Sequence, residues 1–143
     1  MKPLLAFVLM LTLLSPAKAQ LPVDPRVARS VTDEFIAYPL RLGYSSRFYR
    51  GDQNSLSLEP AVLVISCERI KQSLWRLLEI NTPARGKIFL HLRPARNALE
   101  QATIVVEQGL TGWEYHIDVP DSLSPVAFFH AIIHASLLEI ANR

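Results

Sequence analysis

Two histidines, His130 and His134, stand four residues apart in an apolar stretch near the C-terminus. On a helix this spacing is about one turn, so both imidazoles lie on the same flank. Imidazole nitrogens are common zinc ligands, and two of them in this arrangement can reach one metal ion. We therefore single out His130 and His134 as candidate metal ligands. The competing interpretation is a pair of neutral histidines bonded inside or beside the core, without a metal.

The sequence favours this second interpretation, because zinc sites in proteins usually have three or four protein ligands. The only nearby carboxylate, Glu139, follows His134 by five residues, which turns it about 140° away around a regular helix. No cofactor is therefore expected, and zinc bound by His130 and His134 is the alternative. No catalytic residue is predicted.

The two histidines belong to a helix that is predicted over residues 125–142. Ser124 and Pro125 form a typical N-cap followed by a first-turn proline. Of the sixteen residues from Val126 to Ala141, only four are polar, so we expect this helix to be buried on most sides.

A second helix is predicted over residues 61–79, where apolar residues recur with the helical period. Cys67, the only cysteine, lies in the middle of this face and is interpreted as a small buried hydrophobe rather than a reactive thiol. Val64 and Trp75 are expected to project from the opposite, polar side. The apolar face consists of Leu63, Cys67, Ile70, Leu74, Leu77 and Leu78.

The remaining regular segments are predicted strands at 46–50, 87–93, 102–108 and 113–119. Two glycines within 109–112 permit a hairpin turn between the last two strands. His91 and His116 fall on these strands as surface or half-buried residues. The predicted fold class is α+β, with a small, largely antiparallel sheet of about four strands on which the helices 61–79 and 125–142 pack.

The N-terminal stretch has the order of a secretory signal peptide. Lys2 is followed by an apolar run from Leu4 to Leu14, and Ala17 and Ala19 supply the small residues of a cleavage site. We expect residues 1–19 to be a signal peptide, 20–44 a tether and edge segment, and 45–143 a single domain. The protein is then exported, to the periplasm or the extracellular space, with no membrane association after cleavage.

The balance of charges argues against two classes of partner. The chain carries 15 basic and 13 acidic residues, a net charge of +2, but Lys2 and Lys18 lie in the predicted signal peptide. Without them the basic and acidic residues balance. A nucleic-acid or anionic-membrane partner normally goes with a basic excess, so neither is expected. An exported protein remains as the possible partner.

Over residues 45–143 the chain resembles the zincin metallopeptidases, in particular the peptidase-MA-like exported proteins of the glutamate-zincin type. The resemblance lies in the element order (strand, helix, strand, hairpin, apolar helix) and in the histidine pair at the place of the family's His-Glu-x-x-His motif. It implies zinc binding by His130 and His134. However, Ala131 stands at the position of the family's catalytic glutamate. A further ligand, which the family places on a later helix, has no counterpart, so the resemblance is to an N-terminal lobe with a degenerate motif.

Three hypotheses about function follow from these observations. The first is a non-catalytic exported module that acts by binding or by association with another exported protein. The second is a zinc-dependent hydrolase whose site is completed by a partner, a second copy or a downstream segment. The third is a truncated remnant without function. The first is favoured, because alanine at position 131 can neither take nor pass on a proton.

We predict that the exported protein begins at Gln20, because signal peptidase reads the small residues Ala17 and Ala19. Intact-mass measurement or N-terminal sequencing of exported material checks this. Recovery of a membrane-bound chain that retains Met1 would contradict it.

Overall fold

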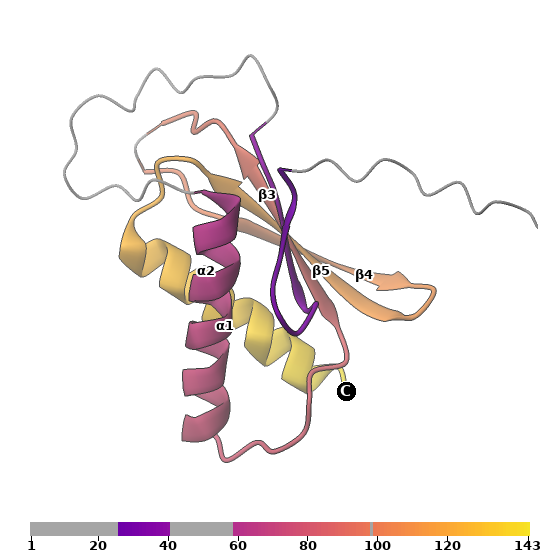
Figure 1. The fold of residues 1–143 in the computed structure, drawn as a ribbon. Helices are drawn as coiled ribbons and strands as arrows, with labels where there is room; N and C mark the ends of the chain where they lie inside the picture. The colour runs from indigo at the N-terminus through magenta and orange to yellow at the C-terminus, as the bar shows by residue number, and fades with distance from the viewer. Residues whose placement is uncertain (1–25, 41–58, 98) are drawn as a thin grey trace, which may run out of the picture.

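The computed structural model describes residues 26–40, 59–97 and 99–143. In this part of the chain, five strands form one sheet and two helices pack against it (Figure 1). The elements in chain order are β1 (Ala28–Arg29), β2 (Phe35–Tyr38), α1 (Pro60–Leu77), β3 (Lys87–Arg93), β4 (Thr103–Gly109), β5 (Gly112–Pro120) and α2 (Pro125–Ala141). The predicted α+β class and both predicted helices are confirmed.

The order of the strands in the sheet is β1-β2-β3-β5-β4. The pairs β2–β3 and β3–β5 are parallel, whereas β1–β2 and β4–β5 are antiparallel. The prediction of a largely antiparallel sheet of about four strands is therefore wrong in this detail. The reason lies in the connections: α1 returns the chain from β2 to a parallel β3, and the β4–β5 hairpin places β5 between β4 and β3.

The N-terminal segment supplies part of this sheet. Residues 28–29 and 35–38, which the sequence placed in the segment before the domain, form β1 and β2, and Phe35 is fully buried. Phe35 pairs in register with Ile88 of β3, so β2 lies inside the sheet. The predicted strand at 46–50 and the predicted signal peptide lie outside the described residues.

The core lies between the helices and one face of the sheet. Alternate residues of the central strands, among them Leu90 of β3 and Ile117 of β5, point to this face and are fully buried. Their neighbours Phe89 and His116 point to the other face and are only half-buried. Figure 1 shows both helices on the same side of the sheet. No helix among the described residues is both long and apolar enough to cross a bilayer.

Helix α1 is rotated relative to the predicted apolar face. Val64, expected on the polar side, is buried with 4% exposure, whereas Leu77 and Leu78 are 79% and 45% exposed. The buried residues of this helix are Leu63, Val64, Cys67 and Lys71. The pattern favoured the leucines of the last turn, but the buried contacts of α1 lie in its first three turns, where the helix crosses the sheet and α2.

A comparison of two valines on α1 tests this rotation. Val64→Ala should lower the free energy of unfolding by about 1–3 kcal/mol, because it leaves a gap in the core. Val62→Ala, at a position that is 53% exposed, should change it by less than about 0.5 kcal/mol. The gain in helix propensity from valine to alanine is common to both variants. Chemical denaturation measures the difference, and equal effects would contradict the observed burial.

Candidate functional site

The structure places His130 and His134 together on one flank of α2, and both are exposed. The helix begins at Ser124, whose hydroxyl accepts a hydrogen bond from the backbone N–H of Ala127 at 3.2 Å. The favoured interpretation, two histidines inside or beside the core, is therefore wrong about their environment. The side of α2 that faces the core carries Phe128, Ile132, Ala135, Ser136 and Glu139.

Glu139 points away from the pair, as its spacing predicts. Its carboxylate is 3% exposed and accepts hydrogen bonds from the backbone N–H groups of Arg85 at 2.8 Å and Gly86 at 3.5 Å. Within the described residues, no cluster of three or more histidine, cysteine, aspartate or glutamate side chains is arranged to hold a metal ion. The described part of the chain therefore gives His130 and His134 no third ligand.

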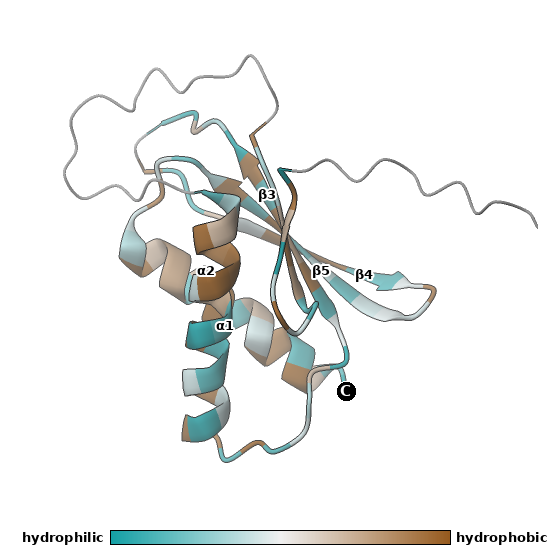
Figure 2. Cartoon of the chain, in the orientation of Figure 1, coloured by the Kyte–Doolittle hydropathy of each residue, from teal (hydrophilic) through white to brown (hydrophobic). Residues whose placement is uncertain are grey.

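Apolar side chains accompany the histidines on the exposed side of α2. Val126, Phe129 and Leu137 are 65%, 47% and 42% exposed. We call the set formed by Val126, Phe129, His130, Ile133, His134 and Leu137 the outer face of α2. Its members recur at the helical spacing, and the hydrophobic colour of much of α2 is visible in Figure 2. The prediction of a helix buried on most sides is thus wrong, because α2 is apolar on both sides and only one side meets the core.

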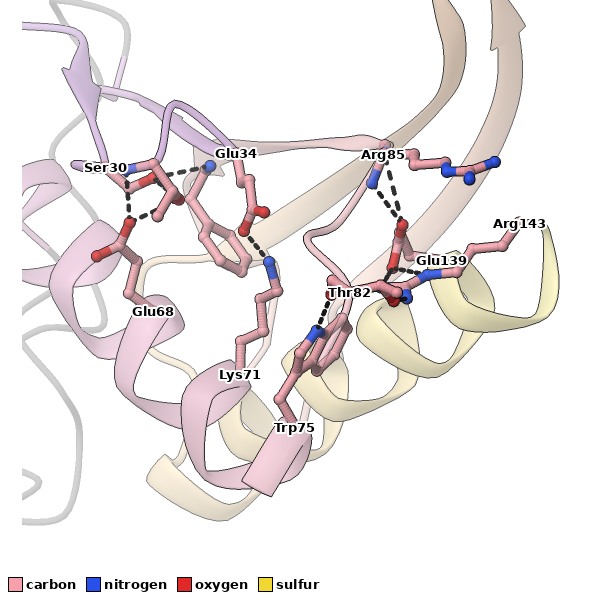
Figure 3. Close-up of polar contacts among 12 residues, drawn as sticks. Ser30, Glu34, Glu68, Lys71, Trp75, Thr82, Arg85, Glu139 and Arg143 are labelled. Atoms are coloured by element: carbon pink, nitrogen blue, oxygen red, sulfur yellow. Dashed lines mark hydrogen bonds and ion pairs between the residues drawn. The ribbon is translucent and has the colours of Figure 1, made fainter. Parts of the chain in front are cut away.

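A second site, which the sequence did not indicate, lies where α1 meets the N-terminal strands and the loop after α1 (Figure 3). A cleft of about 530 Å³ is bordered there by Thr32, Glu68, Lys71, Trp75 and Thr82, among others. Lys71, 9% exposed, forms an ion pair with Glu34, and its ammonium lies 4.8 Å from the centre of the Trp75 ring. Lys71 follows Leu63 and Cys67 at one-turn spacing on the buried side of α1, and its charge kept it out of the predicted apolar face.

The polar groups of this cleft are tied to one another. Glu68 accepts hydrogen bonds from the backbone N–H and the hydroxyl of Thr32, at 3.0 and 2.7 Å. The indole of Trp75 donates to the carbonyl of Thr82 at 3.1 Å. Trp75 therefore covers the loop after α1. These contacts fasten α1 to two loops, which is a structural role.

Behind the cleft, Glu139 and Arg143 form an ion pair of 3.0 Å at the end of α2. The guanidinium of Arg143 also reaches Thr82 and lies 5.2 Å from the centre of the Trp75 ring. Close packing requires glycine at position 86, because a Cβ there would lie 2.6 Å from Cε2 of Tyr115. The network thus fixes the entry into β3 against the last turns of α2.

Burial changes the pKa values of two groups on α1. Burial lowers the pKa of Lys71 to about 8, against the raising effect of Glu139, and Arg143 lowers it further. Burial also raises the pKa of the Cys67 thiol well above its usual range. A fully buried, protonated thiol is a poor nucleophile, in agreement with the interpretation of Cys67 as a core residue.

The other two histidines, His91 and His116, lie on the face of the sheet that the helices do not cover. His91 Nε2 is 3.2 Å from His116 Nδ1, the rings are 5.5 Å apart between centres, and their planes differ by 15°. This combination places the rings edge to edge in nearly one plane, so the pair shares one hydrogen bond. Tyr38 stacks on His91 and Phe89 on His116, at 4.9 and 4.8 Å. Burial and the neighbouring His116 lower the pKa of His91, against the raising effect of Asp118.

Comparisons with protein families, with curated proteins and with solved structures found no match to this chain.

The buried lysine predicts a dependence of stability on pH. The pKa of Lys71 falls from its ordinary value of 10.5 to about 8 on folding, so between these pH values the unfolded chain binds more protons. The free energy of unfolding should therefore gain a contribution that rises with pH across this window. Denaturation at a series of pH values measures the slope, which should be smaller in Lys71→Met.

Lys87→Met is the matched control, because Lys87 is half-exposed and pairs with the exposed Asp33. This variant should keep the slope of the unmodified protein. An unchanged slope in Lys71→Met would show that Lys71 does not titrate in this window.

Proposed function

We propose that this protein is an exported, non-catalytic module that acts by associating with another protein through the outer face of α2. The observation that carries the proposal is the exposure of Val126, Phe129 and Leu137 on one side of a single helix. Isolated exposed apolar residues are normal on protein surfaces, whereas a continuous apolar stripe on a helix is typical of an interaction surface.

The chemistry of the stripe supports a protein partner. From Pro125 to Leu138, α2 contains no acidic residue, lysine or arginine, so the outer face offers no charge to a nucleic acid or an anionic lipid. Apolar side chains at the helical spacing are suited to packing against another helix or an apolar groove. Burying them would remove apolar surface from water, at a gain of about 25 cal/mol per Å² before the costs of association.

Export and the zincin-like ancestry belong to the same proposal. Export rests on the composition of residues 1–19, and the ancestry on the element order and the histidine pair on α2. Ala131 is half-buried beside the pair and supplies no base, which favours a binding role over peptide hydrolysis.

One observation favours the alternative, a zinc-dependent hydrolase completed by a partner or a downstream segment. Both imidazoles are exposed on the same flank, so they are accessible to a metal ion and to ligands from outside the described residues. Such an enzyme would still need a base from the partner, because position 131 has none.

A photoreactive amino acid at position 129 tests the proposed association in the native compartment. We expect light-dependent cross-links to one discrete protein species, a second copy included, because Phe129 lies within the outer face. The same probe at Leu110, which is fully exposed in the β4–β5 turn, is the matched control and should give no such species. Equal cross-linking at the two positions would contradict the proposal.

A further inference from the structure

The outer face of α2 carries two of the four ligands that a structural zinc site needs. His130 and His134 are exposed, lie on one flank and are one helical turn apart. Two imidazoles at this spacing can bind one zinc ion, but structural zinc takes four protein ligands in a tetrahedron. The described residues contain no third ligand in reach, so the pair leaves coordination positions that another molecule can fill.

The position of the pair along the helix indicates what that molecule is. Helix α2 runs from Pro125 to Ala141, so its middle residue is Ile133, and the midpoint between the two histidines is Ile132. A two-fold axis near this midpoint would overlap two copies of α2 along almost their full length. It would also bring His130 of one copy beside His134 of the other, so that two identical faces supply four imidazoles.

The remaining members of the outer face fit the same arrangement. Val126 and Phe129 lie on the N-terminal side of the pair, Leu137 lies on the C-terminal side, and Ile133 stands between the histidines. Around a central metal ion, these side chains would form an apolar rim on both sides. Glu139, the only charged residue of α2, is 3% exposed on the opposite side, so two outer faces meet without repulsion between like charges.

We propose that the partner of the outer face is a second copy of this chain, and that a zinc ion held by His130 and His134 of both copies joins the two. The inference rests on the proposed function, because it names the partner of the same surface. The zinc ion is structural here, with all four positions taken by imidazoles and none open to a substrate.

Sedimentation velocity of the purified exported protein, with zinc chloride and with a chelator, tests this inference. We expect a monomer in chelator and a dimer when one zinc ion is added per two chains. Cobalt in place of zinc should give the strong visible absorption of a tetrahedral site. In His130→Ala/His134→Ala both responses should be lost while the far-ultraviolet circular dichroism is unchanged, because both side chains are exposed.

His91→Gln is the matched control, because it removes an imidazole from the uncovered face of the sheet and should leave the zinc response unchanged. Binding of one zinc ion per chain without dimerisation would overturn the inference, as would a monomer that binds no zinc. A dimer that persists in chelator and in the double variant would overturn the role of zinc. Cross-links from position 129 exclusively to a different protein would leave the proposed function standing and overturn the second copy as partner.

Discussion

The helices cover the sheet on one face only, and this asymmetry decides which side of every other element is buried. Parallel pairing of β3 with both β2 and β5 brings Phe35, Ile88 and Tyr115 into one row of the covered face. The next row on that face contains Ala37, Leu90 and Ile117. All six side chains are at most 3% exposed, so two rows from three strands build most of the floor of the core. Because α1 and α2 share this floor and also contact each other, each helix keeps one side for solvent.

In the C-terminal halves of the two helices, buried charged residues replace some of the apolar contacts with the sheet. Lys71 pairs with Glu34, and the carboxylate of Glu139 accepts hydrogen bonds from two backbone N–H groups and pairs with Arg143. Buried ion pairs add little net stability, because desolvation offsets most of their attraction. Their effect is to fix the orientation of the helices, because any other orientation would leave a buried charge without its partner, at a high cost in free energy. The Lys71–Glu34 pair ties α1 to the segment before β2, and the contacts of Glu139 hold the loop before β3 against α2.

Local patterns in the sequence predicted the elements whose burial alternates or repeats within one segment. The strand predicted at 87–93 matches β3, because Ile88, Leu90 and Leu92 alternate with more polar neighbours. By contrast, β2 has only four residues, and three of them are buried in succession. It therefore lacks the alternation of apolar and polar residues by which a strand is predicted. The parallel pairing of β3 and β5 joins segments far apart in the chain, and no local pattern encodes it. The cleft around Lys71 was missed for a related reason, because a lysine on the buried side of α1 contradicts the usual pattern of hydrophobic residues.

The rotation of α2 about its axis is the step that hydrophobicity alone could not predict. This helix is apolar on nearly all sides, so turning it would exchange one apolar face for another at little cost. Glu139 decides the rotation, because its carboxylate reaches the backbone N–H groups of Arg85 and Gly86 only when it points inward. At about 140° from Glu139 around the helix, His134 must then point outward, and His130 follows one turn earlier. The buried carboxylate of Glu139 thus fixes the loop before β3 against α2. It also determines that the outer face, with its apolar side chains and two histidines, lies on the opposite side of the same helix.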